Sequence, residues 1–121
     1  MTIIRIDHVQ ITIPGGAEEE ARRFYCGLLE LHEIEKPAAL KSRGGFWLQV
    51  GDMQVHVGTE NGAARSGSKA HVAYEVNDLC ALRNRLREAA IVFVDCVPLP
   101  GCDRFEVRDP FGNRVEFLQP S

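Results

Sequence analysis

Two histidines and one glutamate draw attention because they occupy matching places in similar segments of the sequence. His8 and His71 each lie within a stretch that alternates apolar and polar residues, and Glu116 lies in a third such stretch near the end of the chain. A further histidine, His56, lies in a fourth. Imidazole nitrogens and carboxylate oxygens are together typical ligands of zinc, nickel, iron(II), manganese and cobalt. The residue types therefore predict divalent-metal chemistry, provided that the fold brings them together.

An internal repeat is the strongest reason to group these residues. Both halves of the sequence predict the order strand, helix, short strand and hairpin. When IDHVQITI is aligned with KAHVAYEV, His8 falls on His71. When MQVHV is aligned with NRVEF, His56 falls on Glu116. Alternation places all four side chains on one face, which we expect to be the inner face of a cup. Polar groups inside a fold are costly unless satisfied, and one shared metal ion would satisfy them.

The elements that must position these residues follow from hydrophobic periodicity and from turn residues. Strands are predicted at 4–13, 32–36, 70–76, 91–96, 104–108 and 113–118, a hairpin at 46–57, and helices at 17–31 and 79–89. A two-residue Gly-Asp turn sets the register of the hairpin, so that Trp47 faces His56. An Asn-Asp pair precedes the second helix and is expected to cap it.

This order of elements predicts an α+β fold made of two tandem βαβββ modules. The expected boundaries are 1–58 for the first module and 70–121 for the second, joined by a linker at 59–69 that is rich in glycine, serine and alanine. Together the modules are expected to form one domain. Its core would be a curved eight-stranded mixed sheet with the helices on the outer face.

Composition excludes several classes of function. The 121 residues are 45% hydrophobic and 26% charged, with a formal net charge of −3, and they contain no basic patch of the kind that binds nucleic acid. No apolar run approaches the ~20 residues that cross a bilayer, and the N-terminal stretch alternates like a strand, unlike a signal peptide. We therefore expect a cytoplasmic protein with no nucleic-acid or membrane partner. The four cysteines lack CxxC spacing and a secreted context, so no disulfide is expected.

Segments 6–9 (IDHV), 24–31, 70–73 (AHVA) and 109–116 (DPFGNRVE) resemble one known family, and the last of them is the most specific. The family is the vicinal oxygen chelate superfamily, which includes glyoxalases, extradiol dioxygenases, fosfomycin-resistance enzymes, methylmalonyl-CoA epimerases and bleomycin-resistance proteins. The resemblance implies a glyoxalase-like fold and a divalent metal cofactor. It also implies a homodimer, in which a metal site is often assembled from two chains.

The resemblance also implies which residues hold the metal. The family places ligands on the first strand of each module and on the last strand, and these positions are occupied by His8, His71 and Glu116. A further ligand position is occupied by His56, where glyoxalase I-like proteins have a glutamate that acts as ligand and base. This departure argues against standard glyoxalase I activity. His56 is therefore interpreted as a fourth ligand, as a general base with a pKa near neutrality, or as a pocket-lining side chain.

Other residues are predicted to contact a substrate. They share the inner face by alternation or carry a positive charge, and they are Gln10, Thr12, Trp47, Gln49 and Arg104. For Trp47, packing at the rim of the core is an equally good interpretation. Arg43 and Arg108 are also candidates for an anionic substrate, although solvated surface charge is the default interpretation for any single arginine.

Two functions are compatible with this sequence. The first is a metal-dependent enzyme that binds a small oxygenated substrate through two oxygens on the metal, in lyase, isomerase, thiol-transfer or ring-cleavage chemistry. The second is a metal-free protein that binds a drug or another small molecule, as bleomycin-resistance proteins do. The four potential ligands favour the enzyme, and Trp47 suits the binding protein.

Overall fold

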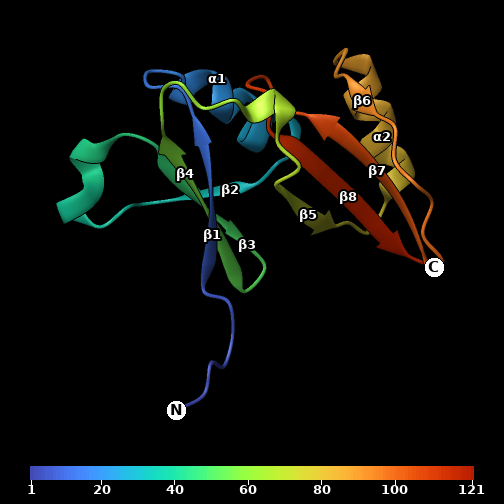
Figure 1. The fold of residues 1–121 in the computed structure, drawn as a ribbon, viewed down its shortest axis with the longest axis horizontal. Coiled ribbons are helices and arrows are strands. Elements are labelled where there is room, and N and C mark those ends of the chain that lie inside the picture. The colour runs from blue at the N-terminus through green and yellow to red at the C-terminus, as the bar shows by residue number, and fades with distance from the viewer. The chain divides into compact units, whose positions relative to one another are not determined.

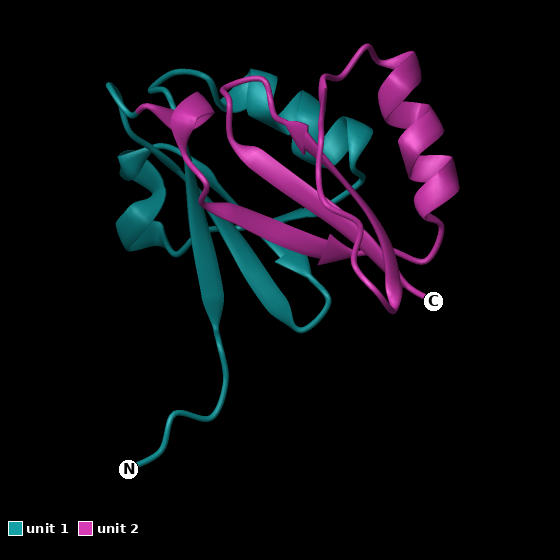
Figure 2. Ribbon diagram, turned by 45° about the vertical axis from the view of Figure 1, so that its right-hand side comes forward, with its two compact units in different colours: residues 1–63 teal, residues 64–121 magenta.

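The computed structural model describes residues 1–121, which divide into two compact units, Met1–Ala63 (unit 1) and Ala64–Ser121 (unit 2) (Figure 2). Each unit contains one four-stranded mixed sheet. The eight strands and the repeated strand–helix–strand order confirm the prediction of an α+β fold with tandem βαβββ modules. The division between the units falls inside the segment 59–69. No helix in either unit has the length and apolar character needed to span a membrane.

Unit 1 follows the predicted order of elements, with one addition (Figure 1). Its elements are β1 (His8–Ile13), α1 (Glu18–Arg22), the π-helix η1 (Arg23–Leu28), β2 (His32–Ile34), the 3-10 helix η2 (Ala38–Arg43), β3 (Phe46–Val50) and β4 (Met53–Thr59). The strand order is β1-β4-β3-β2, with β1 parallel to β4 and the other pairs antiparallel. The addition is η2, which the sequence pattern did not predict.

The hairpin of β3 and β4 has the predicted register. Val50 pairs with Met53 and Trp47 pairs with His56, because the two-residue turn begins at Gly51, whose φ of 59° suits a tight hairpin. One face of this sheet carries the buried core of the unit, and α1 and η1 contribute to the same core. The buried apolar residues of unit 1 are Ile13, Ala21, Phe24, Tyr25, Phe46, Leu48, Val55 and Val57. The opposite face is therefore left for the polar side chains.

Two predicted boundaries in unit 1 were wrong. The first strand begins at His8 and not at residue 4, and Ile4 and Ile6 are exposed. Alternation alone predicted a longer strand, but β1 lies at the edge of the sheet, and its β4 partner begins only at Met53. The helix predicted at 17–31 ends earlier, at Leu28, because the chain turns at Glu30 with a φ of 61°.

Unit 2 repeats the pattern. Its elements are the 3-10 helix η3 (Arg65–Gly67), β5 (His71–Glu75), α2 (Leu79–Glu88), β6 (Phe93–Val94), β7 (Cys102–Arg108) and β8 (Arg114–Pro120). The strand order is β5-β8-β7-β6, with β5 parallel to β8. This is the same topology as in unit 1, so the two sheets are built alike, strand for strand.

Local signals explain the ends of the elements in unit 2. The Asp78 side chain caps α2 by accepting a hydrogen bond of 3.0 Å from the Ala81 amide. Leu79 and Leu86 on the buried face of α2 join the aromatic core of the sheet, and Arg83 lies 5.1 Å over the Phe105 ring. The turn between β7 and β8 is held by Asp109, whose carboxylate accepts hydrogen bonds from two following amides.

Candidate metal and substrate site

The strand pairing places the repeated residues at equivalent positions in the two units. In unit 1, Gln10 pairs with His56, so His8 lies two residues before the partner of His56 along β1. In unit 2, Ala73 pairs with Glu116, so His71 lies two residues before the partner of Glu116 along β5. Each unit therefore brings one histidine of its first strand beside one candidate ligand of its last strand.

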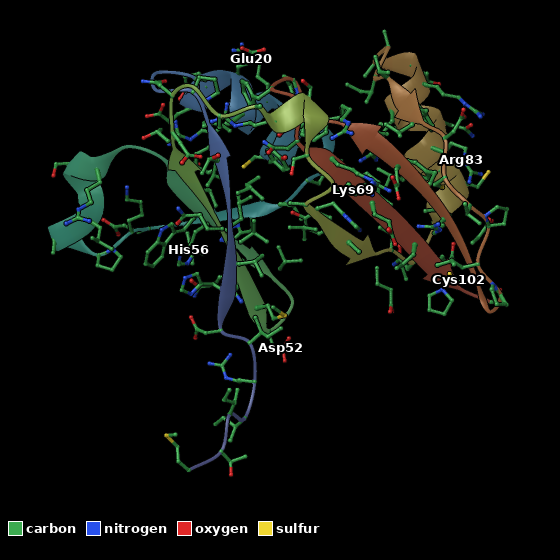
Figure 3. All side chains as sticks on the ribbon, in the orientation of Figure 1. Glu20, Asp52, His56, Lys69, Arg83 and Cys102 are labelled. Atoms are coloured by element: carbon green, nitrogen blue, oxygen red, sulfur yellow. The ribbon has the colours of Figure 1, made fainter.

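In unit 1, three rings form a continuous stack. The His8 and His56 ring centroids are 4.0 Å apart with an interplanar angle of 15°, and those of Trp47 and His56 are 3.8 Å apart with an angle of 3°. His56 is the middle ring and is only 6% exposed. Figure 3 shows His56 on the side of β4 that faces the η2 segment. The stack fixes the orientation of His56 more firmly than that of the outer rings.

Hydrogen bonds select one free nitrogen on each imidazole of unit 1. His8 Nδ1 lies 3.0 Å from an Asp7 carboxylate oxygen, which leaves Nε2 as the nitrogen with a free lone pair. His56 Nε2 lies 2.8 Å from Gln54 Oε1, which leaves Nδ1. A carboxylate or carbonyl behind an imidazole is the usual support for a histidine that binds a metal or moves a proton.

The environment of His56 keeps it neutral. Burial lowers the pKa of His56 below its ordinary value of 6.5, and the nearby His8 ring lowers this pKa further. Asp7 acts in the opposite direction but more weakly. A neutral imidazole is the form that binds a metal or accepts a proton. His56 is thus suited to two of the three roles that the sequence left open.

In unit 2, His71 faces Glu116. The Nε2 atom of His71 is 3.3 Å from Glu116 Oε1, and its Nδ1 atom is 2.9 Å from the Lys69 carbonyl oxygen. The contact of Nδ1 with that carbonyl oxygen orients the ring, so that Nε2 is the atom that faces the carboxylate. A neighbouring positive charge stabilises the carboxylate, and either Arg104 or a metal ion can supply it.

A network of buried charges surrounds Glu116. Arg104 Nη1 lies 3.2 Å from Glu116 Oε1 and 3.3 Å from Glu106 Oε1, and Arg114 holds Glu106 through two hydrogen bonds. The side chain of Glu106 is fully buried, and the hydrogen bond from Arg114 lowers its pKa. Neither Glu106 nor Arg114 was predicted from the sequence as a site residue. Alternation along β7 was a usable signal, because Glu106 pairs directly with Glu116.

An open pocket of about 560 Å³ lies on the polar face of unit 1. The three stacked rings form one wall, and residues of the segment around η2 form another. Gln10 also lines it, and its predicted contact with a substrate stays a prediction. The pocket is within the usual size range for small-molecule sites in proteins.

Three other residues predicted to contact substrate have partners in the protein. The Gln49 amide donates to the Gly51 and Met53 carbonyl oxygens and so braces the hairpin turn. Thr12 donates a hydrogen bond of 3.2 Å to Glu60. Arg104 belongs to the charge network of unit 2 and also donates to the Val97 carbonyl. Their predicted substrate contacts therefore remain predictions.

The residue types suit a divalent metal ion, but the structure contains no group of three or more histidine, cysteine, aspartate or glutamate side chains that could hold one. Each unit contains one pair, His8 with His56 in unit 1 and His71 with Glu116 in unit 2. The oriented imidazoles and the facing of His71 and Glu116 are the features of this structure that match a metal-binding set. Arg104 is the competing cation, because it already contacts the oxygen of Glu116 that faces His71.

A family model and a solved structure both relate this chain to the glyoxalase family. A sequence model of the Glyoxalase/Bleomycin resistance protein/Dioxygenase superfamily matches residues 5–117. A crystal structure from Bacillus anthracis, described as belonging to the glyoxalase family, is 40% identical with a TM-score of 0.91, and the match covers 100% of this chain and 98% of that chain. No curated protein matches the sequence.

Two more distant structures share the fold. A glyoxalase/dioxygenase from Nostoc punctiforme is 16% identical with a TM-score of 0.81, and the match covers 97% of this chain and 91% of that chain. The fosfomycin resistance protein FosX from Mesorhizobium loti is 15% identical with a TM-score of 0.75, and the match covers 99% and 95% of the two chains. At these identities the likeness concerns the fold alone.

Proposed function

This chain belongs to the Glyoxalase/Bleomycin resistance protein/Dioxygenase superfamily, and we propose from this membership that it is a metal-dependent enzyme acting on a small oxygenated molecule. The proposed ligands are His8, His71 and Glu116, with His56 as a fourth ligand or as the general base. Zinc, nickel, iron(II), manganese and cobalt all suit this donor set. The proposed chemistry is that of a lyase, isomerase, thiol transferase or ring-cleaving dioxygenase.

The observation that carries the proposal is the contact of His71 with Glu116. An imidazole Nε2 atom 3.3 Å from a carboxylate oxygen, on a ring already oriented by the Lys69 carbonyl, is an arrangement that a metal ion would stabilise. The matching geometry of His8, oriented by Asp7, supports the same conclusion for the second imidazole.

The residues of the chain have separate parts in this proposal. A bound divalent ion supplies Lewis-acid stabilisation of negative charge on two neighbouring substrate oxygens. His56 accepts or returns a proton at Nδ1, because its Nε2 is engaged by Gln54 and its burial keeps the ring neutral. Trp47 stacks on His56 and holds it in place while it lines the pocket.

Metal content of protein purified without chelator tests this proposal. We expect about one equivalent of a divalent metal per chain, lost on His8→Ala and on Glu116→Gln. His32→Ala is the matched control, since His32 is an exposed histidine of β2 that lies outside the proposed set. If all three variants keep the metal of the wild-type protein, or if the wild type contains none and binds none when it is supplied, the proposal fails.

The proposal extends to a homodimer in which the ligands of one ion come from two chains. A complementation experiment tests this arrangement. His8→Ala and Glu116→Gln proteins are each purified in metal-free form, then unfolded, mixed and refolded together. If the set is shared between chains, each mixed dimer regains one intact ligand set out of two. Random pairing makes about half of the dimers mixed, so metal binding should return to about one quarter of all sites. No recovery means that each chain supplies its own ligands.

A metal-free binding protein is the second candidate, and one observation favours it. The pocket of unit 1 is lined by Trp47 and two imidazoles, and unit 2 already neutralises Glu116 with Arg104. Tight binding of a small molecule that is unchanged by chelator and by Glu116→Gln would favour this candidate over the enzyme.

A further inference from the structure

The pocket of unit 1 has an uneven charge. Two permanently cationic side chains, Lys36 and Arg43, contribute to its lining, and no aspartate or glutamate does. Lys36 lies two residues before η2 and Arg43 is the last residue of η2, so a single short segment supplies both charges. A cleft whose charged lining is all of one sign concentrates ligands of the opposite sign.

Lys36 is held at the pocket. Its Nζ atom donates a hydrogen bond of 2.6 Å to the Gly44 carbonyl oxygen, and the side chain is half-buried. This contact ties together the two ends of the segment that contains η2. An ammonium group has three protons to donate, so Lys36 retains donor capacity toward the pocket after it has closed this loop.

Arg43 has no carboxylate partner. It is exposed, and it forms no ion pair or hydrogen bond with the rest of the chain, whereas Lys41, two residues earlier on the same 3-10 helix, is paired with Glu35. A guanidinium presents a planar fork of donors that matches the two oxygens of a carboxylate or of a phosphonate. Of the two cationic residues of η2, the unpaired Arg43 lines the pocket and the paired Lys41 does not.

The rest of the lining includes a flat aromatic surface. The stacked rings of His8, His56 and Trp47 line the same pocket as Lys36 and Arg43. A ligand that bridges the two walls needs an oxyanion at one end and an apolar or planar body at the other. The cationic part of the lining does not follow from the proposed metal ligands, because Lys36 and Arg43 are not among them.

We propose that the pocket of unit 1 binds the oxyanion of a small organic acid, a carboxylate or phosphonate, through Arg43 and Lys36, while the body of the molecule lies against Trp47. The proposal rests on the proposed function in one respect, namely that this pocket receives the substrate. It assigns the substrate a class, an organic anion, and it makes Arg43 a determinant of specificity.

The single tryptophan of the chain makes a direct test possible. Trp47 lines the pocket, and no other tryptophan contributes to the emission. Cyclohexanecarboxylate and its neutral isostere cyclohexanecarboxamide are titrated into the chelator-treated full-length protein at low ionic strength, with methylphosphonate and inorganic phosphate as further probes. We expect a saturable change in emission with the carboxylate and binding about tenfold weaker for the carboxamide, as expected for loss of a charge-assisted hydrogen bond.

Matched variants locate the charge that matters. Arg43→Gln is expected to weaken carboxylate binding at least about fivefold, and Lys36→Gln by a similar factor. Lys41→Gln removes the same charge from the same helix outside the pocket lining, and it should change binding less than about twofold. Circular dichroism spectra of all three variants check that the fold is retained.

The outcomes separate cleanly. Equal binding of carboxylate and carboxamide overturns the proposal, as do equal effects of Arg43→Gln and Lys41→Gln. Binding of methylphosphonate but not of inorganic phosphate supports the requirement for an organic body, and the reverse order contradicts it.

The titration is repeated in Glu116→Gln, which removes a proposed metal ligand in unit 2. Retained anion binding in that variant shows that the pocket works as inferred even if no metal binds, so failure of the metal proposal and failure of this one are distinguishable.

Discussion

His71 directs its Nε2 atom at Glu116 Oε1 across 3.3 Å, while the opposite nitrogen of the same ring contacts the Lys69 carbonyl at 2.9 Å. The ring is thereby oriented from behind, and its Nε2 atom and the Glu116 carboxylate lie where they can share a cation. Arg104 supplies a cation in the structure, and a metal ion is the alternative that the proposed function requires.

Metal binding should be visible as thermal stabilisation. A ligand present at about one hundred times its dissociation constant stabilises the folded state by roughly 2.7 kcal/mol, which for a chain of this size raises the melting temperature by about 10 °C. We expect this shift on addition of nickel, zinc or manganese to chelator-treated protein, measured by differential scanning calorimetry. It should disappear in His71→Ala and persist in His32→Ala. A shift that survives in His71→Ala would assign the metal to another place.

Arg104 should oppose the metal. Its guanidinium lies 3.2 Å from the oxygen of Glu116 that faces His71, so its charge competes with a metal ion for the same carboxylate. Arg104→Met is expected to tighten metal binding severalfold in isothermal titration calorimetry. The same substitution should lower the free energy of unfolding of the metal-free protein by about 1–3 kcal/mol, since two buried carboxylates lose a partner. Weaker metal binding in Arg104→Met would mean that the arginine positions Glu116 for the metal.

The pKa of His56 should lie below 6.5, because the ring is buried between two others and one of these is His8. A lowered pKa in the folded state means that His56 is protonated more readily in the unfolded chain. Its contribution to stability is therefore complete above about pH 6.5 and is lost as the pH falls through the folded-state pKa.

Trp47 emission provides the measurement, since a protonated imidazole stacked at 3.8 Å changes the environment of the indole. In chelator-treated protein the emission should titrate with a midpoint below pH 6.5. In His8→Gln the midpoint should move upward, toward the ordinary value for histidine, because a neighbouring ring that can carry charge has been removed. A wild-type midpoint at or above pH 6.5 would contradict the assignment.

Gly45 should be indispensable to the segment that bears Arg43. Its φ is 78°, and a Cβ atom there would lie 2.0 Å from the Val57 carbonyl oxygen, a contact that no side-chain movement relieves. Gly45→Ala is expected to lower the free energy of unfolding by more than about 3 kcal/mol in urea denaturation, since backbone strain of about 1–2 kcal/mol adds to the clash.

Gly62 is the matched control for Gly45. Its φ of 79° is nearly the same, but a Cβ atom there would meet nothing within 4 Å. Gly62→Ala should therefore cost only the strain of a left-handed backbone, about 1–2 kcal/mol. Equal losses in the two variants would show that the close approach to Val57 is relieved by a shift of the backbone.

Much of this fold was predictable because its signals are local. A two-residue turn and strict alternation determine which side chains share a face, so the register that pairs Trp47 with His56 followed from the residues alone. The repeat predicted that His8 is placed relative to His56 as His71 is relative to Glu116. The register of the parallel strand pairs confirmed this equivalence.

Other features depend on contacts between residues that are distant in sequence, and only the tertiary structure decided them. The pairing of β7 with β8 placed Glu106 beside Glu116, and the side-chain rotamers then enclosed both within reach of Arg104. Gln49 turned toward its own hairpin although alternation put it on the polar face. Periodicity assigns a side chain to a face of a strand, but the partner that it meets there depends on packing and on the neighbouring charges.

The sequence by itself determined the two βαβββ units and the faces that carry the imidazoles and the glutamate, because a period of two along a strand leaves no choice of face. The tertiary structure alone decided that Lys36 and Arg43, from the segment that contains η2, line the same pocket as the stacked rings of unit 1. That short 3-10 helix has no periodic signal of its own, and it is held by the Lys36 contact to Gly44 and by the close passage of Gly45 past Val57.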